Sequence, residues 1–198
     1  MKVSAPLWRL GDDPARLAAV LARGGVLAIP TESSYGLAVD PRSAVGVEAI
    51  YRAKARERGM ALPVVAADLG QLVALGVPRD APGLDWALER WPAALTLVVP
   101  LARPLPASAG DGTLAVRVPE HAGLREVLRR LGHALTATSA NPSGEPPYLG
   151  AEEVAEWLGE SDALVVDGGR LPGGAPSTLV RFADGAPEVL RQGRVTIR

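Results

Sequence analysis

The sequence predicts an α/β fold built on a mixed β-sheet, and three observations point to it. Segments with apolar residues at helical spacing interleave with short apolar runs of strand length along the whole chain. Several strand-like runs follow one another with only a turn between them, which favours a mixed sheet over a purely parallel one. With 198 residues, 47% of them hydrophobic, the chain can bury one core, so we expect a single domain over 1–198.

The first helix and the first strand are marked at both ends. Residues 14–23 carry apolar residues at helical spacing, follow the capping candidates Asp12 and Asp13, and stop at two glycines. The run 26–29 is short, apolar and closed by a proline, which is typical of a buried strand. The polar residues 31–34 follow it, at the kind of strand end where α/β sheets place binding sites.

The remaining elements are predicted by the same periodicities. Apolar residues at helical spacing predict five further helices, at 44–55, 71–75, 83–90, 122–131 and 152–158. Short apolar or β-branched runs predict seven further strands, at 62–67, 96–99, 114–118, 134–138, 163–166, 178–181 and 188–191. Two connections rich in proline and glycine, 100–112 and 168–176, are long enough to form mobile flaps.

The composition excludes several kinds of chemistry. The chain has no cysteine, which rules out disulfides, thiolate nucleophiles and cysteine metal sites. His121 and His133 lack the spacing of a zinc site, so we expect no metal held by side chains, and we expect His121 in a turn or cap. A net charge of -1 gives no global signal for nucleic acid, and no apolar run reaches membrane-spanning length, so we expect a cytoplasmic protein without a membrane partner.

Two groups of polar residues suggest a nucleotide-binding site. Residues 136–144 (TATSANPSG) end an apolar run with hydroxyls, an amide and a glycine turn, which can grip phosphate or carboxylate. Lys54, Arg56 and Arg58 alternate after a predicted helix, so in an extended segment all three would face one phosphate group. The alternative is a set of solvated cations that complement the helix dipole. Walker and dinucleotide glycine spacings do not occur, so a nucleotide would need another fold.

A further arginine lies inside an apolar strand. Arg117 is flanked by valines in LAVRVP, so its charge needs a partner. We favour a clamp for a substrate carboxylate, and the alternative is an internal salt bridge to Glu120 or another acid. The stretch 30–37 (PTESSYGL) also offers hydroxyls, a carboxylate and a glycine that permits close backbone approach. By itself it is better explained as a turn after a strand, with Tyr35 packed on the core.

The order of these motifs resembles the YrdC/TsaC family of threonylcarbamoyl-AMP synthases, in its short, single-domain form. The matches run from about Gly24 to Gly193 and read, in order, GGVLAIPTESSYGLAVD, IYRAKARERG, RWPAALTLVVP, LAVRVPEH, TATSANPSGEPP, APSTLVRF and VLRQGRV. Any one of these would be weak, but seven in this order are specific. The resemblance implies a twisted mixed β-sheet flanked by helices around one concave cleft.

The resemblance also implies a nucleotidyltransferase reaction. L-threonine, bicarbonate or CO₂, and ATP would give threonylcarbamoyl-AMP and diphosphate for the t6A37 modification of tRNA, with Mg²⁺ as the expected ion. A separate t6A transferase complex would receive the product, and tRNA or double-stranded RNA is a further candidate partner. The alternative is a YciO-like protein of the same fold that has no synthase activity and binds double-stranded RNA through phosphates.

Family motifs assign residues to both substrates. Lys54, Arg56 and Arg58 would surround the ATP phosphates and act catalytically by neutralising the leaving diphosphate. The other nucleotide-binding residues, expected on the opposite side, would be Thr96, Ser139, Asn141 and Arg191. The threonine-binding residues would be Thr31, Arg117, Ala137 and Ser177, with the substrate carboxylate on Arg117.

Two stretches depart from the family pattern. Many members carry a histidine after the cationic motif, in a stretch like PLIVHV, whereas residues 62–67 of this chain read LPVVAA. The matching position is alanine, so a histidine contact to threonine is absent. The family's PGPLT appears as PAALT at 92–96, which loses a glycine and retains Thr96.

Overall fold

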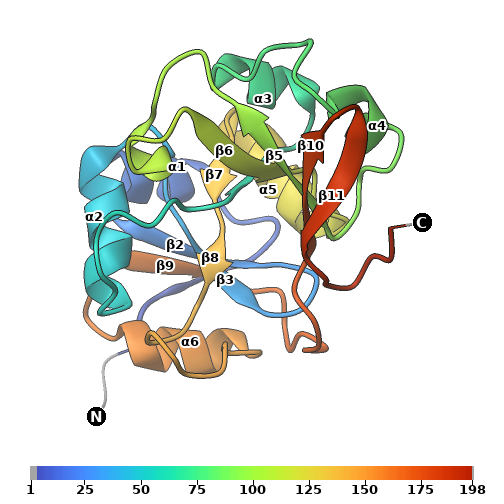
Figure 1. The fold of residues 1–198 in the computed structure, drawn as a ribbon. Helices are drawn as coiled ribbons and strands as arrows, with labels where there is room; N and C mark the ends of the chain where they lie inside the picture. Colours follow the sequence, from blue (N-terminus) through green and yellow to red (C-terminus); the bar gives the residue numbers. More distant parts are fainter. Residues whose placement is uncertain (1–3, 198) are drawn as a thin grey trace.

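The computed structural model describes residues 4–197, which form two mixed β-sheets with helices packed around them (Figure 1). The α/β prediction is confirmed, but the single sheet expected from sequence is two. The five-stranded sheet contains, in spatial order, β1 (Leu7–Trp8), β9 (Ala163–Val166), β2 (Val26–Pro30), β3 (Tyr35–Ala38) and β8 (Thr138–Ser139). The six-stranded sheet contains β11 (Ala186–Arg191), β10 (Thr178–Ala183), β5 (Leu95–Pro100), β6 (Thr113–Arg117), β4 (Val64–Val65) and β7 (Leu135–Thr136).

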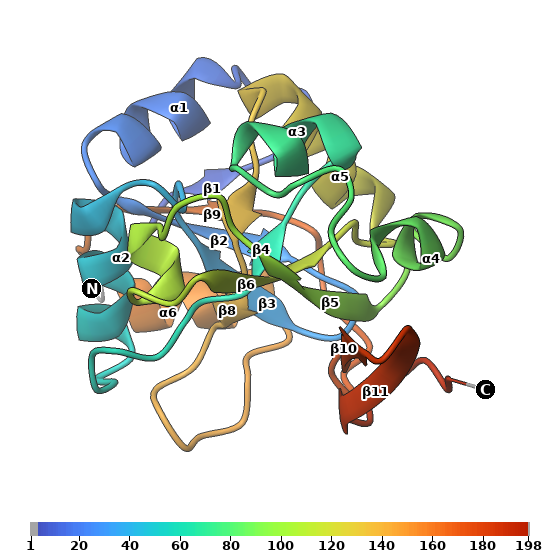
Figure 2. The same cartoon turned by 45° about the horizontal axis from the view of Figure 1, so that its top comes forward.

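Both sheets combine parallel and antiparallel neighbours. In the first, β2 is parallel to β9 and antiparallel to β3; in the second, β6 is parallel to β4 and antiparallel to β5. The strand β2 is buried along its whole length, which explains its continuous apolar sequence. The hairpin of β10 and β11 ends the six-stranded sheet at one side of the molecule (Figure 2).

The helices bury their apolar faces in three clusters of core residues. The described helices are α1 (Ala15–Ala22), α2 (Ala44–Ala53), α3 (Leu69–Ala74), α4 (Leu84–Leu88), α5 (Ala122–Leu131), α6 (Ala151–Leu158) and the 3₁₀ helix η1 (Pro106–Ser108). One cluster joins α2 and α6 to the five-stranded sheet, and another joins α3 and α4 to the six-stranded sheet. A third packs α1 and α5, which lie on the same side in Figure 2, against strands of both sheets. The two sheets therefore share a core.

The predicted strand at 134–138 is two strands in different sheets. Leu135 and Thr136 pair with β4 in the six-stranded sheet, whereas Thr138 and Ser139 pair with β3 in the five-stranded sheet. The backbone changes sheets at Ala137, whose N–H donates to the carbonyl of Pro63. This crossover joins the two sheets beside the polar turn that follows it.

The sequence did not predict β1 or β3. The strand β3 reads YGLA directly after the polar residues 31–34, and a glycine inside a strand lowers its propensity. A side chain at Gly36 would approach the carbonyl of Thr138 on the neighbouring strand to 3.2 Å, so the glycine allows close pairing there. The turn interpretation of Tyr35 is therefore wrong, while its predicted place in the core is confirmed.

Helix ends agree better with the sequence. His121, expected in a turn or cap, is the N-cap of α5, where its Nδ1 accepts a hydrogen bond from the N–H of Leu124 at 3.1 Å. Asp13, a capping candidate for α1, accepts from the N–H of Ala15 at 2.9 Å, but the N-cap position itself is Pro14. Within residues 4–197, no helix has the length and apolar character needed to cross a membrane.

Candidate functional site

A cavity of about 440 Å³ lies where the two sheets meet. Its walls come from the β2–β3 connection, the segment after α2, strands β4, β5 and β6, the crossover at Ala137, and the hairpin of β10 and β11. Among the residues that the structure describes, the cavity is lined by three arginines, Arg56, Arg117 and Arg191, and by no Asp, Glu or Lys. The cavity wall is therefore cationic and suited to anionic groups.

Eight of the eleven site residues predicted from sequence line this cavity. They come from seven distant parts of the chain and are Thr31, Arg56, Thr96, Arg117, Ala137, Ser139, Ser177 and Arg191. The remaining three, Lys54, Arg58 and Asn141, lie outside the lining. The lining also contains residues 33–36, which the sequence had marked as a polar stretch but had not assigned to a ligand.

Lys54 is buried and holds the turn after β8. Its Nζ donates to the carbonyls of Ser139 and Asn141 and to Asn141 Oδ1, the last two at 2.9 Å. Burial and, to a smaller extent, the nearby charge of Arg56 together lower the pKa of Lys54 to about 8. Lys54 and Asn141 are therefore on the same side of the site, which corrects the expectation that they grip a nucleotide from opposite sides.

The three alternating cations do not form an extended segment. Lys54 is the C-cap of α2, and Ala55 adopts a left-handed conformation with φ of 48°, so successive side chains diverge. Arg56 reaches the cavity, whereas Arg58 is 78% exposed and pairs with Glu48 of α2 at 2.5 Å. The expectation that all three project from one side is wrong, because the chain turns immediately after the helix.

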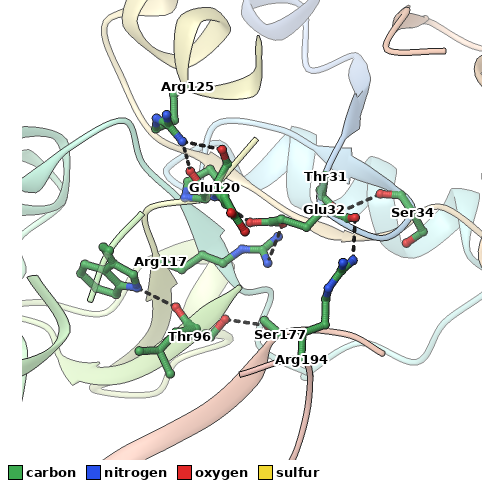
Figure 3. A network of polar contacts seen from close by, with 12 residues as sticks. Thr31, Glu32, Ser34, Thr96, Arg117, Glu120, Arg125, Ser177 and Arg194 are labelled. Carbon is green, nitrogen blue, oxygen red and sulfur yellow. Dashed lines mark hydrogen bonds and ion pairs between the residues drawn. The ribbon is translucent and has the colours of Figure 1, made fainter. Parts of the chain in front are cut away.

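Arg117 forms a buried ion pair with Glu32 at 3.0 Å between Nη1 and Oε2 (Figure 3). The side chains of Arg117 and Glu32 are only 11% and 7% exposed. Burial lowers the pKa of Arg117, Glu32 opposes that shift, and the charge of Arg191 adds to it. Of the two sequence interpretations, the internal salt bridge is present, with Glu32 in place of Glu120, and Arg117 still lines the cavity.

Hydroxyl groups extend the polar lining between the sheets. Thr96 of β5 and Ser177, just before β10, share a hydrogen bond of 2.8 Å between their Oγ atoms. Arg191 Nη2 donates to the carbonyl of Ser177 at 3.0 Å, and Thr31 Oγ1 donates to the carbonyl of Ser34 at 2.7 Å. The lining side chains are thus held in place by their own polar contacts.

Tyr35 lines the cavity and forms hydrogen bonds with the segment that follows β9. Its hydroxyl accepts from the N–H of Gly168 at 2.9 Å and donates to the carbonyl of Gly169 at 2.8 Å. Desolvation by burial raises the pKa of Tyr35, so the phenol stays protonated and can serve as donor. Its full burial favours a structural role, and its aromatic ring after a strand was the sequence signal for that role.

The fold and the cavity define a class: an α/β protein with two mixed sheets and an arginine-lined, anion-accepting cavity between them. The Sua5/YciO/YrdC family profile, described as telomere recombination, matches residues 19–193. The chain belongs to this family.

Curated relatives in bacteria carry one common name. The chain is 38% identical to the threonylcarbamoyl-AMP synthase of Bacillus subtilis (strain 168) over 190 residues, which are 93% of this chain and 55% of that protein. It is also 38% identical to the threonylcarbamoyl-AMP synthase of Thiobacillus denitrificans, with 89% of this chain and 94% of that protein covered. The chain thus spans about half of the first relative and nearly all of the second.

Solved structures share the fold. The crystal structure of P. abyssi Sua5 complexed with L-threonine is 30% identical, with a TM-score of 0.80 over 96% of this chain and 57% of that one. The structure of E. coli YciO, at 23% identity, has a TM-score of 0.77 and covers 96% of both chains, and it supports the fold alone. This chain therefore shares its fold with both of these structures.

Proposed function

We propose that this protein is an L-threonylcarbamoyladenylate synthase, a nucleotidyltransferase that converts L-threonine, bicarbonate and ATP into threonylcarbamoyl-AMP and diphosphate. The observation that carries the proposal is the cavity in which three arginines and several hydroxyls from distant motifs come together. Curated relatives with this activity in their names match most of the chain, and a relative of known structure binds L-threonine. These relatives favour the synthase over the RNA-binding alternative.

The end of the cavity around Arg117 suits an amino acid. A guanidinium can hold a carboxylate with two parallel hydrogen bonds, and a buried one does so in a medium that weakens charges less than water. Thr31, Ala137 and Ser177 lie on the same lining and would surround the rest of the threonine. Arg117 is the residue that we assign to the threonine carboxylate.

The remaining cations suit the nucleotide. Arg56 and Arg191 line the cavity, and neither has an ion-pair partner within 4.0 Å among residues 4–197. We assign them to the ATP phosphates, with Ser139 and Thr96 as hydroxyl ligands on the same lining. Asn141 would act on the nucleotide through the turn that it shares with Lys54, and Arg58 would have to leave Glu48 to reach a phosphate.

The reaction needs positioning and charge neutralisation more than a protein nucleophile. The threonine amine adds to CO₂ and loses a proton, or attacks bicarbonate and releases water, and either route gives a carbamate. An oxygen of this carbamate then attacks the α-phosphorus of ATP, and the bond from that phosphorus to the leaving diphosphate breaks. Fixed arginines near the phosphates stabilise the charge that develops on the leaving group. Among the described residues, the cavity lining offers no carboxylate for Mg²⁺, so the residues present do not form a magnesium site.

A direct assay tests the proposal. Purified protein with ATP, bicarbonate and labelled L-threonine should form diphosphate and labelled threonylcarbamoyl-AMP, whereas omission of threonine should stop both. Arg181→Ala serves as a control, because Arg181 is an exposed arginine paired with Glu188 outside the cavity. Absence of threonine-dependent diphosphate together with salt-sensitive binding of double-stranded RNA would favour the YciO-like alternative.

The biological partners are proposed from the family alone. A synthase of this kind releases a labile intermediate that a separate t6A transferase complex would consume. Direct binding of tRNA or double-stranded RNA and a cytoplasmic location stay predictions. Titration of labelled tRNA into the purified protein at several salt concentrations tests the first of them.

A further inference from the structure

Glu32 places a negative charge directly behind the cationic cavity wall. The described lining carries three arginines and no acid, but Glu32 Oε2 lies 3.0 Å from Nη1 of Arg117, one of those arginines. Oε2 is buried and has no hydrogen-bond partner among the described residues, because the ion pair lacks hydrogen-bond geometry. An acceptor of this kind leaves part of its charge uncompensated within the protein.

Apart from Arg117, two other chain segments contact Glu32 (Figure 3). Its Oε1 accepts from the N–H of Glu120 at 2.9 Å, and its carbonyl accepts from Arg194 Nη1 at 2.8 Å. Arg125 secures the Glu120 peptide in turn, because its Nη1 donates to the carbonyls of Pro119 and Glu120 at 2.6 and 2.7 Å. One oxygen of the Glu32 carboxylate is therefore bound to the Glu120 peptide, and the other lies against Arg117.

The ion pair of Glu32 and Arg117 changes which ligands the Arg117 end of the cavity attracts. Arg117 alone would attract every anion, but Glu32 repels a ligand that carries only a carboxylate. A zwitterion whose carboxylate binds Arg117 places its ammonium group within roughly 10 Å of Glu32, and salt screens a charge interaction in a buried site less than one at an exposed site. Partial burial of the pair strengthens both effects relative to water.

We propose that Glu32 is a specificity-determining residue that makes the Arg117 end of the cavity prefer zwitterionic amino acids to carboxylic acids without an amine. The inference rests on the proposed function and deepens it, since it concerns how the same site selects its amino-acid substrate. Glu32 also makes the arginines of the cavity unequal. Arg117 is paired with an acid, whereas Arg56 and Arg191 have no acid paired with them in residues 4–197 and stay available to phosphates.

The test compares two ligands that share a carboxylate. Isothermal titration calorimetry measures Kd for L-threonine and for 3-hydroxybutyrate, its analogue without the amine, on the wild type and on Glu32→Gln. The ratio of the two Kd values cancels any change in how Arg117 holds a carboxylate. We expect Glu32→Gln to reduce the preference for threonine at least about fivefold, the size of a charge interaction across this distance in a partly buried site.

Matched variants separate local charge from other effects. Glu57→Gln removes an exposed acid beside Arg56, changes the net charge equally, and should keep the wild-type ratio. Glu32→Asp keeps the charge and should keep most of the preference. If Glu32→Gln does not fold, displacement of bound threonine from the wild type by glycine and by acetate, which differ by the amine, tests the preference itself. Glycine should then displace threonine at lower concentration than acetate does.

The outcomes distinguish the inference from the proposed function. If the wild type binds threonine and Glu32→Gln keeps the full preference, or acetate displaces threonine as well as glycine does, the inference is overturned while the synthase proposal stands. If the wild type neither binds threonine nor forms threonine-dependent diphosphate, the proposed function itself is overturned.

Discussion

Lys54 donates a hydrogen bond of 2.9 Å to Asn141 Oδ1, across 87 residues of sequence. A second bond of 2.9 Å to the Asn141 carbonyl and a third to the carbonyl of Ser139 complete the three donors of its ammonium group. The cationic motif and the hydroxyl turn are therefore one structural unit. Lys54 shapes the cavity by holding the turn, with no donor left for a phosphate unless one of these bonds breaks.

Lys54→Met should reduce threonine-dependent diphosphate formation at least about tenfold, because the turn carrying Ser139 loses its support and the carbonyls of Ser139 and Asn141 lose their donor. Arg58→Met is the matched control, since Arg58 is exposed and pairs with Glu48 outside the cavity lining. We expect it to change the rate less than threefold. Equal losses in steady-state assays of the two variants would place Arg58 on the nucleotide.

The titration of Lys54 predicts how stability depends on pH. Its pKa is about 8 in the folded protein and 10.5 ordinarily, so between these values the unfolded chain binds more protons. The contribution of Lys54 to the free energy of unfolding therefore rises as the pH increases across that window, and it is lost as the pH falls through 8. The melting temperature of the wild type minus that of Lys54→Met should increase from pH 8 to pH 10.5, and a constant difference would contradict the lowered pKa.

Arg117→Ala should weaken L-threonine binding about a hundredfold and change ATP binding less than threefold, because only the threonine carboxylate is assigned to this guanidinium. It also leaves Glu32 buried without its cation, which costs roughly 3–5 kcal/mol of stability. Arg117→Lys keeps the charge but not the planar fork, so threonine affinity should fall about tenfold with a smaller loss of stability. Calorimetry with each substrate and thermal melts measure these effects, and equal weakening of both ligands would contradict the assignment.

Arg56→Ala should show the opposite pattern. Arg56 lines the cavity without an ion-pair partner among residues 4–197, so its removal should weaken ATP binding about tenfold and leave threonine binding within a factor of three. Nucleotide titrations at constant ionic strength measure this change. A selective loss of threonine affinity would instead place Arg56 at the amino-acid end.

His121→Ala should lower the free energy of unfolding by about 1 kcal/mol, because α5 loses its N-cap. His121→Asn, which supplies another capping acceptor, should restore most of it. Burial lowers the pKa of His121, and Nδ1 accepts only in the neutral ring, so the contribution is present above about pH 6.5 and is lost as pH falls further. Chemical denaturation at pH 7.5 and pH 5 checks both the size and the sign.

Local sequence patterns predicted an element well where the residues that stabilise it lie within that element. The helix at 122–131 has the predicted bounds, since its apolar spacing, its histidine cap and the glycine after it all lie within the segment. The run 134–138 was predicted as one strand, because its apolar character says nothing about which neighbours it pairs with. The strand β3 was missed because its stability comes from pairing with β2 and β8 on either side.

The sequence by itself determined the α/β class, the family motifs and eight of the residues that line the cavity, because periodicity, capping and motif order are properties of short segments. Only the tertiary structure decided the division into two sheets, the pairing of Arg117 with Glu32, and the place of Lys54 under the turn at Asn141. Each of these joins residues far apart in the chain. Such contacts form only when the packed core brings distant segments together, and no local pattern encodes the partner of a buried charge.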